Sequence, residues 1–405
     1  MIKFDSVVKQ YPDGTVAVNG LDLLAPSGQI TVLVGPSGCG KTTSLRMINR
    51  MIEPTSGRIW LDDQDTGTVE PATLRRGMGY VIQHAGLFPH RTVVDNVATV
   101  PFLLGVDKKR ARAQAIELME RVGLPASFAK RYPAQLSGGQ QQRVGVARAL
   151  AADPPVMLMD EPFSAVDPVV RAELQDEFLR LQSELGKTIV FVTHDIDEAV
   201  KLGDQVAVLR VGGTLAQLAT PGQLLNDPVD DFVAGFVGRD RGYRSLGFEQ
   251  AGDLPTHQEP TVKLGDDGAR VQRAALAGWV LALDDERRPQ GWVNAHAVPP
   301  GVSVGPTLLQ RGGTLAPVGG SLRAALDATL SSPSGRGVLV DENGALLGTI
   351  RAGEVIERIE SQLAARREAS ASAPAAPSAA DPASTPAAPS APASAPTSAA
   401  EGATA

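Results

Sequence analysis

The chain has 405 residues, which is enough for about two domains that each bury a core. Its formal net charge is −7 and no basic stripe runs along it, so we exclude nucleic acid as a main partner. The one cysteine, Cys39, cannot form a disulfide within the chain, which indicates a reduced, cytoplasmic setting. No run approaches about 18 uninterrupted apolar residues, and the start MIKFDSVVKQ lacks the apolar region of a signal peptide. We therefore expect no membrane-spanning segment, and we expect any role at a membrane to depend on a partner protein.

Residues 1–238 combine short apolar runs with segments of helical periodicity. The apolar runs predict strands at 30–34, 78–82, 156–159, 189–192 and 206–210. The periodic segments predict helices at 42–51, 108–122, 139–152 and 169–185, with a further helix beginning near Asp195. Alternating strands and helices favour an α/β fold in which a mostly parallel sheet is covered on both faces. Helices dominate between residues 84 and 153, which indicates an inserted helical subdomain.

The segment 239–255 loses this periodicity and is interpreted as a linker between domains. Beyond it, LALDDERRPQGWV at 281–293 and VLVDENGALLGTI at 338–350 align without a gap, the second 57 residues after the first. Each consists of an apolar strand, an acidic turn and a second strand. We expect two small α+β repeats at 256–312 and 313–363, the first without a clear leading helix. Residues 364–405 are rich in Ala, Pro and Ser with almost no large apolar side chains, which predicts a disordered tail.

The most informative motif is GPSGCGKT, which lies between the strand at 30–34 and the helix at 42–51. Its glycines allow backbone N–H groups to close around a β-phosphate, and the helix N-terminus adds its positive dipole end. Lys41 is expected to reach the β- and γ-phosphates, while the Thr42 hydroxyl ligates Mg²⁺. The motif therefore predicts a nucleoside triphosphate site. Its candidate residues are Gly35, Ser37, Gly38, Gly40, Lys41, Thr42 and Thr43.

A second glycine motif, LSGGQ, precedes the helix predicted at 139–152. Ser137 is expected to cap this helix. The N–H groups of Gly138, Gly139 and Gln140 would then point outward at an anion. The alternative is an ordinary turn that starts a helix. We favour the anion-binding interpretation because a phosphate loop lies upstream in the same chain.

The strand VMLMD ends in two adjacent carboxylates. Asp160 is expected to hold Mg²⁺ through water or the Thr42 hydroxyl. Glu161 is expected to activate or orient the attacking water. A solvated turn is the alternative for such a pair. The sequence SAVD follows at once, and its Asp167 is a candidate nucleotide-binding residue in a loop that reaches across a dimer interface.

Three single residues complete the candidate site. His194 follows the strand IVFVT, and we favour a γ-phosphate sensor over a structural histidine because of its distance behind the two carboxylates. Gln83 ends the strand MGYVI and is expected to connect water and Mg²⁺ with the helical subdomain. Tyr11 precedes the first hairpin and is expected to stack on adenine, the alternative being a half-buried strand tyrosine.

Taken in this order, the motifs of residues 1–238 resemble those of ATP-binding-cassette (ABC) transporter ATPases. The resemblance rests on Tyr11, GPSGCGKT, Gln83, LSGGQ, VMLMDE, SAVD and His194. It implies a P-loop ATPase domain that works as a homodimer, in which two chains enclose two ATP molecules with Mg²⁺. Each site would pair one chain's phosphate loop with the other chain's LSGGQ, so that Ser137 and Gly139 act in trans. Hydrolysis would then remove the γ-phosphate bridge and let the dimer open.

Three further stretches resemble ATPases that serve uptake of glycine betaine, carnitine, choline or proline. They are INRMIEPTSGRIWLDD, YVIQHAGLFPHRTVVDNV and LLNDPVDDFVAGFVG. This implies an importer subunit on the cytoplasmic face of the membrane, bound to an integral membrane permease and indirectly to a substrate-binding protein. Leu87 and Phe88 either dock a permease helix, as the resemblance implies, or pack in a core. The alternatives are an importer ATPase for amino acids or polyamines, a soluble ABC ATPase outside transport, and a regulatory nucleotide sensor.

ATPases of this group commonly carry a pair of cystathionine-β-synthase (CBS) domains, which the repeat described above resembles. Many nucleotide-binding CBS modules have a Ser or Thr and, three residues later, an Asp that holds ribose. Here these places hold Arg351 and Glu354 in the second copy, and Asn294 and Ala297 in the first. We therefore expect no ribose binding in the usual mode, and a structural, dimer-stabilising or charge-sensing role instead.

Overall fold

The structure of the protein is a computed structural model that describes residues 1–83, 86–164 and 166–372. Contacts divide the chain into two compact units, residues 1–355 and residues 356–405. The first unit contains all the sheets of the described residues.

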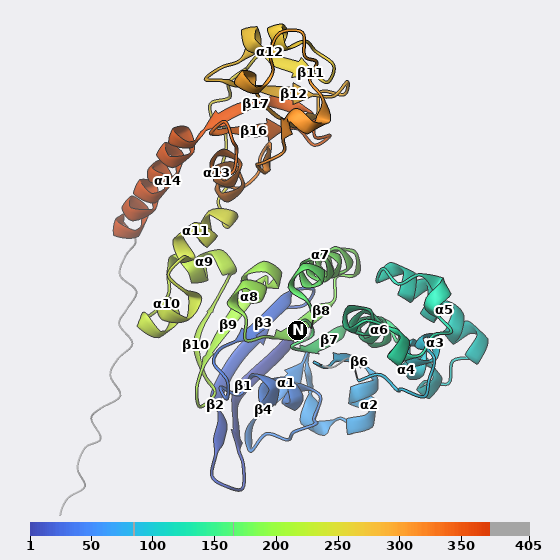
Figure 1. The fold of residues 1–405 in the computed structure, drawn as a ribbon. Helices are drawn as coiled ribbons and strands as arrows, with labels where there is room; N and C mark the ends of the chain where they lie inside the picture. The colour runs from blue at the N-terminus through green and yellow to red at the C-terminus, as the bar shows by residue number, and fades with distance from the viewer. Residues whose placement is uncertain (84–85, 165, 373–405) are drawn as a thin grey trace, which may run out of the picture. The chain divides into compact units, whose positions relative to one another are not determined.

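A six-stranded sheet in the order β10-β9-β3-β8-β7-β6 forms the centre of residues 1–238 (Figure 1). Its strands are β3 (Ile30–Val34), β6 (Met78–Val81), β7 (Val156–Asp160), β8 (Thr188–Val192), β9 (Gln205–Arg210) and β10 (Thr214–Ala219). All neighbours are parallel except β10, which runs antiparallel to β9 at the edge. Every residue of β3, β7 and β8 is buried, as expected for strands covered on both faces. The predicted, mostly parallel sheet is confirmed.

Helices cover the two faces of this sheet. They include α1 (Lys41–Ile48), α6 (Gly138–Leu150), α7 (Pro168–Leu185), α8 (Ile196–Leu202), α9 (Pro221–Asn226) and α10 (Asp231–Val237). The rings of Phe163, Phe178 of α7 and Phe191 of β8 form a buried cluster between this helix and the sheet, with centroids 5.9, 6.1 and 6.4 Å apart. The helix predicted at 42–51 ends early, because Arg50 has a φ of 54° that α-helical backbone does not adopt.

A second, antiparallel sheet of order β2-β1-β4-β5 was not among the strands predicted from the sequence. Its strands are β1 (Ile2–Gln10), β2 (Val16–Ala25), β4 (Ser56–Leu61) and β5 (Gln64–Asp65), and α2 (Pro71–Arg76) follows it. The inward residues Phe4 and Leu21 share one core with Leu45 of α1. This sheet therefore supports the first helix after the phosphate loop from the side opposite the parallel sheet.

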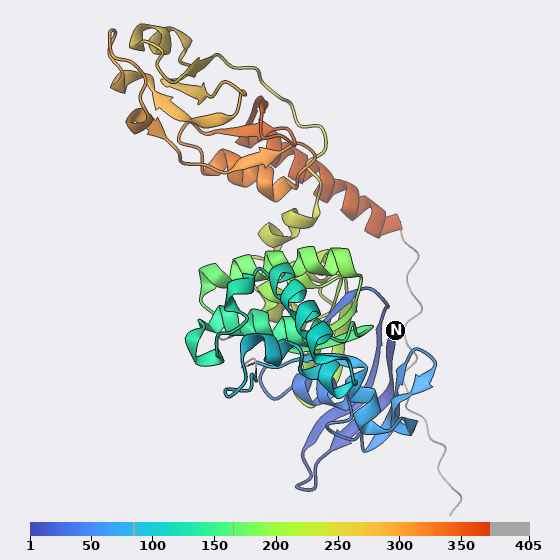
Figure 2. The ribbon, with the colours of Figure 1, turned by 90° about the vertical axis from the view of Figure 1, so that its right-hand side faces the viewer.

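The predicted helical subdomain is present. It contains α3 (Val93–Val97), α4 (Thr99–Leu103) and α5 (Lys108–Arg121), which are grouped with α6 in both ribbon views (Figures 1 and 2). Leu87 packs against its core, whereas Phe88 is 39% exposed, with the Arg91 guanidinium 4.9 Å from its ring centroid. Leu87 is thus partly buried against the subdomain core and Phe88 lies on the surface, and docking to a permease helix stays a prediction.

The C-terminal repeat has the same strand boundaries in both copies. Strands β12 (Trp279–Leu283) and β13 (Pro289–Asn294) recur 57 residues later as β16 (Arg336–Val340) and β17 (Leu346–Arg351). Each hairpin gains a parallel strand, β11 (Thr261–Lys263) beside β12 and β15 (Leu315–Pro317) beside β16. A helix precedes each hairpin, α12 (Gly268–Ala274) and α13 (Leu322–Leu330). The first copy therefore does have a leading helix, contrary to expectation, but it is short.

Two segment boundaries differ from the predictions. The segment 239–255 is not irregular throughout, since it contains α11 (Arg241–Ser245) and a 3₁₀ helix (Leu246–Phe248). Helix α14 (Ala352–Ser372) continues past residue 364, where the disordered tail was expected to begin. Its Ala, Arg and Glu residues are strong helix formers, and the first proline comes only at Pro374. The rest of the predicted tail, 373–405, lies outside the described residues. Among the residues described, no helix has the length and apolarity needed to cross a membrane.

Candidate functional site

The phosphate loop joins the end of β3 to the start of α1, and its shape depends on glycine. Gly40 is the N-cap of α1 with a φ of 88°, and a Cβ there would lie 2.2 Å from the Ala17 carbonyl oxygen. Gly38 also has a positive φ, of 80°. At Gly40 the positive φ and the close approach to Ala17 together require glycine, whereas at Gly38 the space is open and only the positive φ favours it. Glycine conformations therefore shape the turn directly before α1, and the binding of a phosphate by the N–H groups of this turn stays a prediction.

Lys41 is the first residue of α1 and only 7% exposed. Its Nζ donates to the Gly35 carbonyl at 2.8 Å and to the Pro36 carbonyl at 3.0 Å. The ammonium group is thus held inside the curve of the loop. A buried ammonium needs such partners, and a phosphate oxygen would be a stronger one because it is charged.

Asp160 ends β7 and faces the first turn of α1. The Thr42 hydroxyl donates to Asp160 Oδ1 at 2.9 Å, and Arg46 Nη2 lies 3.6 Å from Oδ2. Oxygen ligands of this kind suit Mg²⁺. Arg46 was not predicted from the sequence. It lies one turn after Thr42 on the same helix face, and that spacing is the signal that would have indicated it.

Glu161 follows Asp160 with a φ of 46°, which is unusual for a residue other than glycine. A hydrogen bond from its backbone N–H to the Val192 carbonyl, 2.9 Å long, fixes this conformation against β8. Its Oε2 lies 3.0 Å from Nδ1 of His194, which follows β8. Strained backbone of this kind concentrates at functional sites. The strand ends thus bring the predicted water-activating carboxylate and the predicted sensor together.

One cavity of about 480 Å³ connects the phosphate loop with Glu161 and His194. It is lined by Ala17, Ser37, Gly38, Gly40, Lys41, Thr42, Thr43, Glu161 and His194. Ala17 comes from β2 and was not predicted, because no motif marks it. Gly35 lies behind the loop, where a Cβ would meet the Leu209 carbonyl oxygen at 2.4 Å.

The LSGGQ turn forms a capping box at the start of α6. Ser137 is the N-cap, and its Oγ accepts from the Gln140 backbone N–H at 3.3 Å. Gln140 Oε1 accepts in return from the Ser137 N–H at 3.0 Å. The predicted cap is therefore present. Gly139 is buried, and none of Ser137, Gly138, Gly139 and Gln140 lines the phosphate-loop cavity.

Besides Gly35 and Asp160, three other predicted residues lie outside the cavity lining. Asp167 is exposed and caps α7, accepting from the Val169 N–H at 3.0 Å. Gln83 is exposed, just beyond the end of β6. Tyr11 is half-buried after β1, with Lys9 Nζ 5.3 Å from its ring centroid. Their roles toward water, Mg²⁺ and adenine stay predictions.

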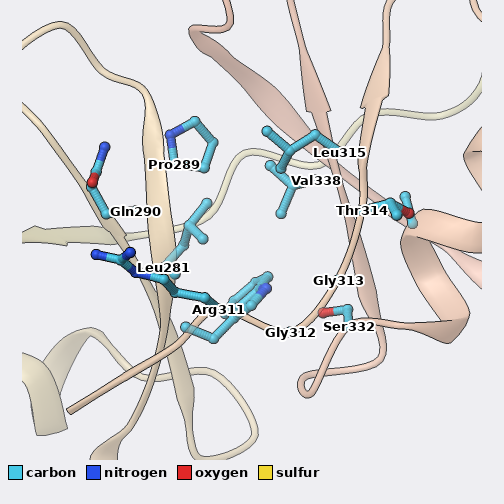
Figure 3. Close-up of a pocket in the computed structure, with 13 residues that line it drawn as sticks. Leu281, Pro289, Gln290, Arg311, Gly312, Gly313, Thr314, Leu315, Ser332 and Val338 are labelled. Carbon is cyan, nitrogen blue, oxygen red and sulfur yellow. The ribbon is translucent and has the colours of Figure 1, made fainter. Parts of the chain in front are cut away.

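A second hollow, of about 310 Å³, lies within the C-terminal repeat pair. Figure 3 shows side chains of the two copies facing one another across it, among them Leu281 and Gln290 on one side and Thr314, Leu315 and Val338 on the other.

Both carboxylate oxygens of Glu354 have polar partners within the repeat pair. Its Oε1 lies 2.5 Å from His257 Nε2, and its Oε2 accepts from the Arg351 N–H at 2.9 Å. These bonds occupy the carboxylate at the position where the resemblance to CBS modules implies a ribose-binding Asp.

The sequence and fold are similar to those of known proteins. Residues 18–164 match the family model described as ABC transporter. The chain is 46% identical over 303 residues to the osmoprotectant import ATP-binding protein of Salmonella typhimurium, covering 72% of this chain and 79% of that protein. It is 43% identical over 303 residues to the choline transport ATP-binding protein of Bacillus subtilis, covering 74% and 79%. A solved dimeric ATP-binding cassette in a post-hydrolysis state, bound to ADP and Pi, is 33% identical with a TM-score of 0.50, covering 55% of this chain and 99% of that one.

Proposed function

The chain belongs to the ABC transporter ATP-binding proteins, and on that premise we propose that it is the ATP-hydrolysing subunit of an importer. The proposed cargo is a compatible solute of the glycine betaine, choline, carnitine or proline class. The cavity that joins the phosphate loop to Glu161 and His194 carries the ATPase part of this proposal. The cargo class is supported by the relatives named for osmoprotectant and choline transport, at 46% and 43% identity.

Four side chains at the cavity, and Asp160 beside Thr42, each have a part in hydrolysis. Lys41 exchanges its loop carbonyls for β- and γ-phosphate oxygens. Thr42 and Asp160 fit Mg²⁺, since their oxygens lie 2.9 Å apart, and the ion neutralises phosphate charge when bound. Glu161 orients the attacking water and accepts its proton. His194, held through Nδ1 by Glu161, keeps its other ring nitrogen for the γ-phosphate.

Coupling to transport follows from the position of the LSGGQ turn. The capped N-terminus of α6 presents N–H groups that suit a phosphate, yet the turn does not line its own chain's cavity. We assign it to the γ-phosphate held by a second copy, so that ATP joins a homodimer and hydrolysis releases it. The permease and, through it, a substrate-binding protein are the partners proposed, with the chain on the cytoplasmic face of the membrane.

Uptake of labelled glycine betaine tests this function, with choline, carnitine and proline as competitors at low and high osmolarity. Cells carry this chain with its permease, either as wild type or as Glu161→Gln. Uptake that rises with osmolarity and disappears in the variant is the expected result. Equal uptake in both would refute this cargo, and amino acids and polyamines would be tested next.

A further inference from the structure

A buried chain of hydrogen bonds joins the His194 segment to α7, and we propose that Glu198, at its centre, is a positioning residue for ATP hydrolysis. The proposal rests on the proposed function, because it uses the roles given there to His194 and the LSGGQ turn. Glu198 itself lies outside the cavity lining.

Glu198 lies in the first turn of α8 and is 5% exposed. Its Oε2 accepts from the Thr193 hydroxyl at 2.7 Å, and its Oε1 accepts from the Gln175 amide on α7 at 3.2 Å. Burial raises the pKa of Glu198, and the hydrogen bond from Thr193 opposes that rise. A carboxylate this deeply buried is destabilising unless such donors satisfy it. Glu198 is therefore a buried carboxylate that would destabilise the fold alone, placed where the Thr193 hydroxyl and the Gln175 amide both need an acceptor.

Thr193 makes this contact relevant to His194. It directly precedes the histidine and is 1% exposed. Its N–H donates to the Leu33 carbonyl of β3 at 3.2 Å, and its Oγ1 accepts from the Asp195 N–H at 3.0 Å. The residues on both sides of His194 are thus fixed through Thr193. Loss of the Glu198 acceptor would free the Thr193 hydroxyl and loosen the backbone that carries His194.

A second connection runs beside the first. Asp195 Oδ2 lies 3.9 Å from Nη1 of Arg171 on α7, and Arg171 Nη2 donates to the Val166 carbonyl at 3.1 Å. Arg171 and Gln175 are one helical turn apart, so they lie on the same face of α7. This face of α7 therefore contacts the His194 segment through both Gln175 and Arg171. Arg171 also contacts the Val166 carbonyl, just before Asp167.

An adjacent face of α7, which carries Val170 and Leu174, packs against the LSGGQ turn. A Cβ added to Gly139 would lie 3.0 Å from Val170 Cγ1 and 3.8 Å from Leu174 Cδ1. The first half of α7 thus contacts two parts of the chain. One is the LSGGQ turn, which is proposed to bind the ATP of a second copy, and the other is the His194 segment, which is proposed to act on the chain's own ATP. Displacement of the turn by a partner's phosphate would move His194 through Gln175 and Glu198. Packed elements transmit such displacements because they do not deform continuously.

The test measures ATP turnover, equilibrium ATP binding and melting temperature of the full chain. Glu198→Ala removes both acceptors. We expect kcat per bound nucleotide to fall by about tenfold or more, as for misplaced catalytic groups. ATP affinity should change by less than about twofold, because Lys41 and Thr42 keep their contacts. Glu173→Gln, on an exposed position of α7, is the control that should behave as wild type.

Two further variants separate positioning from folding. Glu198→Gln keeps the size of the side chain and should lose less turnover than Glu198→Ala. Gln175→Leu should lose turnover too, and combined with Glu198→Ala it should add little, since both break one contact. A loss explained wholly by a smaller folded fraction, or a wild-type kcat in folded Glu198→Gln and Glu198→Ala, would overturn the proposal. If wild type itself neither hydrolyses ATP nor loses turnover in Glu161→Gln, the proposed function has failed and this inference with it.

Discussion

At the scale of single residues, the ammonium of Lys41 is the charge that the phosphate loop encloses. Lys41→Ala removes it without altering the glycines that shape the loop. We expect affinity for ATP to fall by about tenfold to hundredfold, which corresponds to one charge-assisted hydrogen bond of about 1.5–3 kcal/mol. Equilibrium binding of a fluorescent ATP analogue measures this, with exposed Lys109→Ala as the control. An unchanged affinity would contradict the assignment of the loop.

Glu161 differs from Lys41 because it is needed for turnover rather than binding. Glu161→Gln keeps the shape of the side chain but cannot accept the proton of water. Turnover should fall by about 10²–10⁴-fold, the usual contribution of a general base. ATP should still bind and should hold two chains together, which light scattering detects. Full turnover in this variant would remove Glu161 from the catalytic role.

At the scale of elements, the capping box of α6 can be compared with a second one in the same domain. Ser137→Ala should cost about 1 kcal/mol and lower the melting temperature by about 2–4 °C. Thr220→Ala removes the matching cap of α9, where Gln223 completes the box. Both variants should lose similar stability. Only Ser137→Ala should lose turnover beyond that loss, because only its turn is proposed to bind a phosphate. Equal turnover in the two would make Ser137 a cap alone.

Some strands and helices could be predicted from the sequence and others could not, and burial separates the two groups. Strands β3, β7 and β8 are buried throughout, so their unbroken apolar runs are visible in the sequence. Strands β1 and β2 alternate instead, and register shifts between Phe4 and Val7 interrupt that period. Helix α3 spans only Val93–Val97, too short for helical periodicity to register. Predictions thus succeeded where burial is uniform and failed where strands are bulged or helices short.

The candidate site divides in a similar way. Its phosphate loop and carboxylates are contiguous motifs, and they could be predicted because each motif supplies its own geometry. Ala17 and Glu198 could not, since they are ordinary residue types that no motif marks and whose contacts with the loop or with α7 lie far along the chain. What sequence reasoning lacked was the set of contacts between motifs, which only the folded chain brings together.

At the scale of the whole molecule, the C-terminal repeats should modulate the ATPase without taking part in its chemistry. All the described residues that line the phosphate-loop cavity belong to the first 238 of the chain. Truncation at about residue 240 should therefore spare ATP turnover but change its response to salt or osmolarity. Turnover measured across a salt series, with the full chain as control, tests this. An identical response in both would make the repeat pair merely structural.

Two impaired variants should restore each other's turnover if the ATP sites are shared between copies. In a mixed dimer of Lys41→Ala and Ser137→Ala chains, one site combines the intact phosphate loop of the second chain with the intact LSGGQ turn of the first. The other site carries both defects. Mixing equal amounts should yield about half mixed dimers with one working site each, and so turnover well above either variant alone. If each site used only its own chain's turn, every site in the mixture would carry one defect. Turnover would then stay at the average of the two variants.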